Sequence, residues 1–256
     1  MKNRKKTGIV LVHFGTTYDE ARANTMDVLE AEVREQFPEA EVLTAFTSNI
    51  VRKRLKNRGI DYPDLPEALS ALKKQGMETV ILLLSLLLEG QEYEKVLSQA
   101  KEFEEAFSMS ISPPLLREES LEDVAELLQE IYPLQEGEQI VFMGHGSRYP
   151  SDALYRALEK VLQKKGYTAY IATLEGKEGI DDLLPALTQH RDSRLLLAPF
   201  LYVAGDHAHH DMVENDDSWK KILEDKGYQV EAKCIGLGEF QEVRAWYRRK
   251  LSELLS

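Results

Sequence analysis

The sequence predicts an α/β protein made of two similar halves, each a parallel sheet flanked by helices, with a cleft between the halves. Short apolar runs alternate with amphipathic segments along the chain, and this alternation is typical of a parallel sheet covered by helices. The same order of runs then appears a second time in the later part of the chain. With 256 residues, the chain is long enough for two halves of ordinary domain size.

Four strands are predicted in the first half of the chain. They are the apolar runs at residues 8–15, 40–48, 78–88 and 108–112. The segments between them, such as 23–36 and 93–107, carry apolar residues at helical spacing and predict helices. The most apolar run, "VILLLSLLL" from Val80 to Leu88, is too short to cross a bilayer, so we expect a strand buried on both faces.

The second half repeats these blocks in the same order. Residues 9–17 correspond to 140–148, 41–48 to 169–176, 78–94 to 193–209, and 108–128 to 229–251. The repeating unit is of domain size, because the repeats of a solenoid are much shorter. We therefore predict a first half at residues 1–133 and a second half at residues 134–256, which carries the metal site.

Composition excludes several function classes. Acidic residues outnumber basic ones by 44 to 32, and the formal net charge is −12. Binding to nucleic acid or to a membrane surface relies on positive potential, so neither is expected. Cys234 is the only cysteine, which excludes an internal disulfide and a thiolate cluster. The apolar run Ile9–Val12 is too short for the core of a signal peptide, so we expect a cytoplasmic protein. A homo-oligomer is left open.

Three polar residues of the second half follow three different predicted strands. They are His145, Glu175 and His207. Ligands bind beyond the carboxyl ends of strands in open parallel sheets, and these residues should meet at that edge. Two imidazoles and a carboxylate suit Zn²⁺, Co²⁺, Ni²⁺ or Fe²⁺ and leave positions open for a substrate. The alternative is that they are ordinary polar loop residues, as found at strand ends in any α/β protein.

The first half has largely lost this polar set. The residues that the repeat places opposite His145, Glu175 and His207 are Phe14, Thr47 and Glu92. We therefore expect a ligand-facing surface in the first half and the metal ligands in the second. Glu89 is the candidate there for a catalytic carboxylate that shares the metal or accepts a proton. Glu92 fits better as a first-turn glutamate near a helix dipole.

His145 lies between two glycines in "MGHGSRYP", residues 143–150. Gly144 and Gly146 leave the backbone around His145 free of side-chain bulk, which suits an imidazole that faces a large ligand. Ser147 follows at an expected helix start and is a candidate hydrogen-bond donor to an anionic group of the ligand.

The segment "GDHAHHDM" holds half of the six histidines. On a helix, His207 and His210 share a face and His209 points away. His210 is therefore a candidate extra ligand or proton relay, and His209 a solvated residue. We expect His13, inside the first strand, to be a core histidine, and His190 to cap a helix end.

Five basic residues concentrate in "VRKRLKNR", residues 51–58, within a stretch that has no counterpart in the second half. They are Arg52, Lys53, Arg54, Lys56 and Arg58. As a helix, this run would form either a solvated charged face or a patch for ligand carboxylates, which arginine can bind through two donors at once. Arg54, at the centre of the run, is the predicted ligand contact.

With His145 in "GHGS", Glu175 in "TLEG" and His207 in "GDHAHHDM", the chain resembles the anaerobic sirohydrochlorin cobaltochelatases of the class II chelatase superfamily, relatives of the ferrochelatases. "VHFGTT", "LLEGQEYE" and "YVAGDHAHHDM" match as well, so the resemblance covers nearly the whole chain. It implies insertion of Co²⁺ into sirohydrochlorin, or its relative precorrin-2, on the oxygen-independent route to cobalamin. It also implies that no ATP is needed, and the sequence has no phosphate-binding loop motif.

The resemblance implies a role for each site residue. His145 and His207 hold the metal, His145 also accepts a proton, and Glu175 completes the ligand set or carries protons away. Fe²⁺ and Ni²⁺ suit the same ligands as Co²⁺. Sirohydrochlorin bears eight carboxylates, which gives the basic run a partner. Two other classes compete: a metal-dependent hydrolase that activates water, and a non-catalytic metal-binding protein or metallochaperone.

Overall fold

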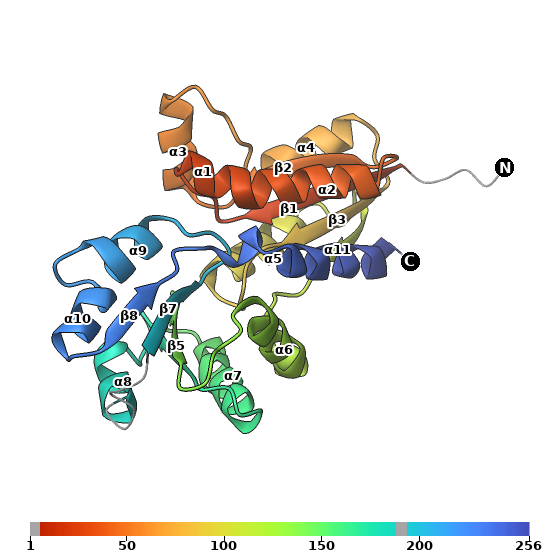
Figure 1. Ribbon diagram of the computed structural model, residues 1–256. Helices are drawn as coiled ribbons and strands as arrows, with labels where there is room; N and C mark the ends of the chain where they lie inside the picture. Colours follow the sequence, from red (N-terminus) through yellow and green to blue (C-terminus); the bar gives the residue numbers. More distant parts are fainter. Residues whose placement is uncertain (1–5, 188–193, 256) are drawn as a thin grey trace. The chain divides into compact units, whose positions relative to one another are not determined.

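The computed structural model describes residues 6–187 and 194–255, and these form two four-stranded parallel sheets flanked by helices (Figure 1). The strand orders are β2-β1-β3-β4 and β6-β5-β7-β8, so the second sheet repeats the first position by position. The predicted class of two similar α/β halves is confirmed.

The first half follows the predicted order of elements. They are β1 (Thr7–His13), α1 (Asp19–Arg22), the π-helical segment η1 (Ala23–Asp27), α2 (Val28–Gln36), β2 (Glu41–Phe46), α3 (Asn49–Asn57), α4 (Leu65–Lys74), β3 (Thr79–Leu84), α5 (Gln91–Lys101) and β4 (Ser108–Ile111). The long apolar run of residues 80–88 is the strand β3 and the turn after it. No helix in the described ranges is long and apolar enough to cross a membrane.

The first half ends with η2 (Glu118–Ser120) and α6 (Leu121–Ile131). The second half contains the corresponding elements and some short additions. They are β5 (Gln139–Gly144), η3 (Pro150–Asp152), α7 (Ala153–Lys164), β6 (Ala169–Thr173), α8 (Ile180–Leu187), β7 (Arg194–Phe200), α9 (Asp206–His209), the π-helical η5 (His210–Glu214), α10 (Trp219–Asp225), β8 (Gln229–Ala232), η6 (Leu237–Glu239) and α11 (Gln241–Leu255).

The central strands are apolar along their whole length because helices cover both of their faces. Every residue of β5 is buried, and so is every residue of β1 from Gly8 onward. In the first sheet, Val12 and Leu84 pack against Leu69 of α4 and Val96 of α5. Burying such side chains contributes about 1.5–3 kcal/mol each, which makes these runs the main source of stability.

The core of the second half is built in the same way. Val141 and Leu197 of the central strands pack with Leu183 of α8 and with Trp219 and Leu223 of α10. The two halves therefore have matching cores as well as matching strand orders. These rigid sheets fix the positions of the loops at their carboxyl edges.

The compact units do not coincide with the sequence repeat, because each half contributes its last helix to the other unit. One unit runs to Leu115 and includes the chain from Val243, and the other spans Leu116–Glu242. In the second unit, Lys165, the residue after α7, binds Glu122 of α6 at 3.0 Å. In the first, Arg244 of α11 binds Glu32 of α2 at 3.1 Å. The predicted boundary between residues 133 and 134 groups α6 with the first half and α11 with the second. In the compact units, α6 belongs to the second unit and α11 to the first.

Backbone hydrogen bonds fix how the two repeats correspond. Gly15 and Gly146 both have a positive φ, at +97° and +72°, so they occupy the same turn after the central strand. The N–H of Ser48 donates to the carbonyl of Phe14 at 3.2 Å. In the second half, the N–H of Glu175 donates to the carbonyl of His145 at 2.8 Å. Ser48 is thus the counterpart of Glu175. The predicted match with Thr47 is wrong by one residue, because the hydrogen-bond register and not residue likeness sets the alignment.

Candidate metal centre

The three predicted metal ligands all follow strands of the second sheet at its carboxyl edge. His145 comes directly after β5, Glu175 two residues after β6, and His207 is the second residue of α9, which follows β7. The backbone N–H of Glu175 donates to the carbonyl of His145 at 2.8 Å, which ties these two loops together. The prediction that all three residues follow strands at the carboxyl edge of the second sheet is confirmed.

The structure brings the two imidazoles together. The ring centroids of His145 and His207 are 5.0 Å apart and the rings are nearly perpendicular, at 84°. Both side chains are accessible: His145 is exposed and the side chain of His207 is 42 % exposed. Two accessible imidazoles at this distance can bind one small cation or one proton-donating ligand.

Hydrogen bonds select which ring nitrogen of each histidine is left for a ligand. Nδ1 of His145 lies 2.9 Å from the carbonyl oxygen of Gly146, and Nδ1 of His207 lies 2.7 Å from a carboxylate oxygen of Asp211. Both partners can only accept, so each Nδ1 carries a hydrogen, and in the neutral form of each ring the lone pair is on Nε2. Metal-binding histidines are commonly held by such a bond from the second nitrogen.

Asp211 was not among the residues singled out from the sequence. Its spacing of four residues from His207 in a helical segment places both on one face, and that spacing was the available signal. The switch from α9 to the π-helical η5 falls between them. Such irregular helical turns occur often at functional sites.

Glu175 does not join the imidazole pair in this structure. Its side chain is exposed, and the described ranges contain no group of three or more His, Cys, Asp or Glu side chains close enough to hold a metal ion. The structure therefore assembles two of the three predicted ligands.

The glycines on either side of His145 are required by the protein's own packing. A Cβ on Gly144 would lie 2.8 Å from the ring of Tyr155, and a Cβ on Gly146 would lie 2.5 Å from the backbone nitrogen of Gly176. Gly146 also has a positive φ, which other residues rarely adopt. Close packing by Tyr155 and by the loop at Gly176 is thus a further reason for both glycines, and that His145 faces a large ligand stays a prediction.

Ser147 is held within its own loop. Its backbone N–H and its hydroxyl both donate to the carboxylate of Asp152, at 2.6 and 2.8 Å. The hydroxyl also accepts from the N–H of Tyr149 at 3.0 Å. The structure therefore assigns Ser147 to fixing this turn, and its predicted donation to an anionic ligand is not supported.

The remaining histidines of "GDHAHHDM" face carboxylates. Nδ1 of His210 lies 3.2 Å from Glu214, its Nε2 lies 3.8 Å from Asp206, and Nδ1 of His209 lies 3.8 Å from Glu214. His210 is not grouped with the His145 and His207 rings as an extra ligand. His190, the predicted helix cap, lies outside the described residues.

His13 is a core histidine, as predicted. It is fully buried, and its Nδ1 lies 2.7 Å from the hydroxyl of Ser85. Burial lowers the pKa of His13 from 6.5 to about 3, because the charged imidazolium loses its hydration in the core.

The depressed pKa of His13 predicts an acid-sensitive stability. Between pH 6.5 and 3 the unfolded chain binds a proton at His13 that the folded chain does not, so the free energy of unfolding falls as the pH falls. The expected contribution is about 2 kcal/mol between pH 7.5 and pH 5. In urea unfolding, His13→Gln should lose less stability over this interval than the wild type. Equal pH dependence of His13→Gln and wild type would contradict this account.

The first unit presents an aromatic ring and a carboxylate at the matching edge. Phe14 follows β1 and is 48 % exposed, and Glu89 lies exposed in the loop between β3 and α5. Glu92 is the second residue of α5 and pairs with Lys95 of the same helix at 3.5 Å. These positions agree with the predicted surface role of Phe14 and with the structural role expected of Glu92.

The basic run forms α3, as expected, but most of its cations bind acids of the same unit. Arg52 binds Asp64 and Glu67, the two residues of the capping box that begins α4. The other paired cations and their partners are Lys56 with Asp61, and Arg58 with Asp19. Lys53 and Arg54 are exposed, and neither forms an ion pair within the described part of the chain.

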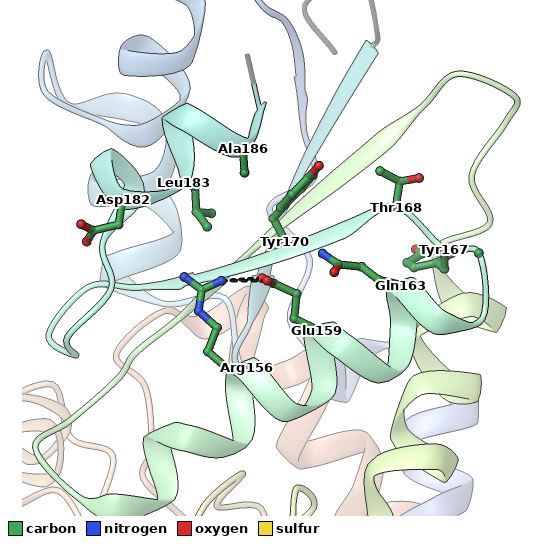
Figure 2. Close-up of a pocket in the computed structure, with 10 residues that line it drawn as sticks. Arg156, Glu159, Gln163, Tyr167, Thr168, Tyr170, Asp182, Leu183 and Ala186 are labelled. Atoms are coloured by element: carbon green, nitrogen blue, oxygen red, sulfur yellow. Dashed lines mark hydrogen bonds and ion pairs between the residues drawn. The ribbon is translucent and has the colours of Figure 1, made fainter. Parts of the chain in front are cut away.

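A pocket of about 530 Å³ lies elsewhere in the second unit, over the outer edge of β6 (Figure 2). Arg156 binds Glu159 there at 2.8 Å, and Glu159 accepts from the N–H of Ile171 at 2.6 Å. Gln163 donates to the carbonyl of Ala169 at 3.0 Å. These side chains protect the backbone of an edge strand. No predicted site residue lines this pocket.

The repeated parallel sheets and the imidazole pair at one carboxyl edge define a two-unit α/β protein with a candidate metal centre. The cobalt chelatase (CbiK) family matches the chain over residues 7–256, and the chain belongs to this family.

Named relatives agree with that assignment. The sirohydrochlorin cobaltochelatase of Salmonella typhimurium is 30% identical over 258 residues, covering 98% of this chain and 97% of the relative. The sirohydrochlorin cobaltochelatase CbiKC of Nitratidesulfovibrio vulgaris is 32% identical over 246 residues, covering 92% of this chain and 86% of the relative.

Solved structures show the same fold at low sequence identity. SirB from Bacillus subtilis with Fe³⁺ has a TM-score of 0.67 at 14% identity, and the match covers 97% of this chain and 95% of SirB. The siroheme-biosynthesis enzyme CbiX of denitrifying bacteria has a TM-score of 0.57 at 18% identity, covering 98% and 100%.

Proposed function

We propose that this protein inserts Co²⁺ into sirohydrochlorin, without ATP and in the cytoplasm, as a step of oxygen-independent cobalamin synthesis. The observation that carries the proposal is the pair of accessible imidazoles, His145 and His207, whose Nδ1 atoms are both bonded to acceptors. Family membership and the names of two relatives with matching length support it.

In the proposed first step, Nε2 of His145 and Nε2 of His207 bind Co²⁺ after it has lost part of its water. Imidazole is of intermediate softness, so it holds Co²⁺ less firmly than a set of thiolates would. A site with few protein ligands leaves positions open to the nitrogens of the macrocycle. Glu175, on a loop bonded to His145, completes the ligand set when the metal is present.

Insertion then exchanges one metal ion for two protons. Four ring nitrogens bind Co²⁺. The two pyrrole nitrogens that carry a hydrogen each release it as a proton. The Nε2 that the metal leaves has a free lone pair, so His145 is suited to accept one of the two protons there. Glu89 and Glu175 are carboxylates able to take up or pass on the other.

The first unit supplies contacts to the ring and no imidazole ligand. Phe14 occupies the position that His145 holds in the repeat, and its exposed ring can stack on the macrocycle.

The proposal is tested by incubating the purified protein with sirohydrochlorin and Co²⁺ in the absence of ATP while the visible spectrum is followed. A chelatase converts the spectrum to that of the cobalt complex at a rate above the uncatalysed one. A metallochaperone would bind Co²⁺ and leave the rate unchanged, and a hydrolase would do the same. Parallel reactions with Fe²⁺, Ni²⁺ and precorrin-2 identify the preferred metal and tetrapyrrole.

Removing the charge of either carboxylate should slow insertion without abolishing it. We expect Glu175→Gln to lower the rate of insertion about tenfold and to weaken retention of Co²⁺, because a charged ligand is lost. Glu89→Gln should lower the rate by a similar or smaller factor and leave Co²⁺ retention unchanged. The measurements are initial rates and cobalt titrations of both variants. Full activity of Glu175→Gln would exclude it from the reaction.

A further inference from the structure

Helix α3 is an insertion that only the first half contains. In the second half, β6 leads through a short loop into α8, whereas in the first half α3 comes between β2 and the matching helix α4. Ser48, the counterpart of Glu175, accepts a hydrogen bond from the N–H of Val51 and so caps α3. The helix therefore begins at the sheet edge where the other half carries Glu175.

The start of α3 lies next to the backbone of Phe14 and Gly15. The N–H of Ser48 donates to the carbonyl of Phe14 at 3.2 Å, and the Cβ position of Gly15 is 3.1 Å from a methyl group of Val51. Ile50, in the first turn of α3, is 67 % exposed, the highest value among the large apolar side chains of the described ranges, and Phe14 is 48 % exposed. Two apolar side chains are thus open to solvent along one short stretch of this edge.

Two cations follow Ile50 on the same face of the helix. Lys53 and Arg54 are three and four residues further on, which places them one turn along from Ile50. They are also the two members of the basic run that form no ion pair in the described structure, whereas Arg52, Lys56 and Arg58 do. Lys73 and Lys74 of α4 are likewise exposed and form no ion pair in the described ranges, so what distinguishes Lys53 and Arg54 is their place beside Ile50.

We infer that the α3 face, formed by Ile50, Lys53 and Arg54, selects tetrapyrroles that carry many carboxylates. The inference rests on the proposed function and adds the element that determines its specificity. Ile50 and Phe14 match the apolar plane of a macrocycle, and Lys53 and Arg54 match carboxylates on its rim. Arg54 can bind a carboxylate through two donors, and Lys53 acts as a point charge.

The test measures binding of metal-free sirohydrochlorin and of protoporphyrin, which has two carboxylates, to the full chain by fluorescence titration. Lys53→Gln/Arg54→Gln should raise the Kd for sirohydrochlorin roughly tenfold, from two exposed ion pairs, and the Kd for protoporphyrin much less. The Kd of this double variant for sirohydrochlorin should also depend less on ionic strength than the Kd of the wild type. Ile50→Gln should weaken binding of both tetrapyrroles about equally.

A matched control removes the same charge at the other edge of the sheet. Lys73 and Lys74 are exposed in the last turn of α4, which leads to the amino end of β3. Lys73→Gln/Lys74→Gln should leave both Kd values unchanged, and all variants should bind Co²⁺ like the wild type, because the imidazole pair belongs to the other unit.

The outcomes separate this inference from the proposed function. If the wild type metallates sirohydrochlorin but Lys53→Gln/Arg54→Gln and Lys73→Gln/Lys74→Gln bind it equally well, the selection role of α3 is wrong and the chelatase function stands. If the wild type neither binds nor metallates sirohydrochlorin, both are overturned.

Discussion

Replacing either His145 or His207 with alanine is expected to lower the rate of cobalt insertion by at least about 100-fold, equivalent to ~2.7 kcal/mol. The described structure groups only these two imidazoles at the site, so losing one leaves a single nitrogen to hold the ion. Both side chains are accessible at strand ends, and their removal opens no cavity in the core. Insertion rates and thermal unfolding of each variant measure the two effects.

Three controls sharpen this experiment. His209→Ala removes an imidazole from the same segment and should leave insertion near the wild-type rate, because His209 faces Glu214. Imidazole added to the buffer should restore part of the activity of His145→Ala by occupying the vacated position. The double variant should be little worse than either single one, since residues that act as a unit are not additive.

Wild-type rates in either alanine variant would remove the metal-site assignment altogether. Loss of activity together with a large drop in the unfolding temperature would instead indicate a structural role for the histidine. The exposure of His145 makes that second result unexpected.

The fold was predictable because the strands carry their own signal. Runs such as Ile9–Val12 and Ile140–Phe142 are apolar at every position, which only strands covered on both faces require. The exchange of α6 and α11 was not predictable in this way. Val124 of α6 and Val243 of α11 show that each helix buries one face, but an amphipathic pattern does not state which core receives it.

The site was predictable to the level of the sheet edge and no further. The rule that strand ends carry ligands placed His145 and His207 together, since it depends only on topology. The bonds that decide what each side chain does depend on local conformation. Ser147 is bound by Asp152, and Arg52 by the capping box of α4, through contacts that spacing does not specify. The space beside Gly146 is filled by a neighbouring loop for the same reason.

Removing the carboxylate of Asp211 is expected to weaken Co²⁺ binding about 10–100-fold, the usual effect of losing a partner that orients a metal-binding histidine. Asp211 accepts from Nδ1 of His207 at 2.7 Å. Without it, the ring of His207 can rotate and can carry its hydrogen on Nε2, the atom that must bind the ion. Asp211→Ala removes the acceptor, whereas Asp211→Asn keeps an oxygen that can accept and loses only the charge. Asp211→Asn should therefore lose less affinity for Co²⁺ than Asp211→Ala.

The measurement is a Co²⁺ titration followed by the visible absorption of bound cobalt, without tetrapyrrole, so that turnover plays no part. Asp217→Ala is the matched control, because Asp217 is exposed in the turn after the same helical segment and its removal changes the net charge equally. Equal losses in Asp211→Ala and Asp217→Ala would assign the effect to general attraction of cations by an acidic surface. Unchanged affinity in Asp211→Ala would show that the bond to His207 does not orient the ring.

The two histidines are oriented by different kinds of acceptor. His145 is oriented by a backbone carbonyl, that of Gly146, which no side-chain substitution removes. His207 is oriented by a side chain, so Asp211 is the point at which the support of the site can be changed while both imidazoles remain. If orientation matters, Asp211→Ala should retain weak binding with both rings present, and His207→Ala should bind still more weakly. If the ranking is reversed, Asp211 acts on the metal directly and not through His207.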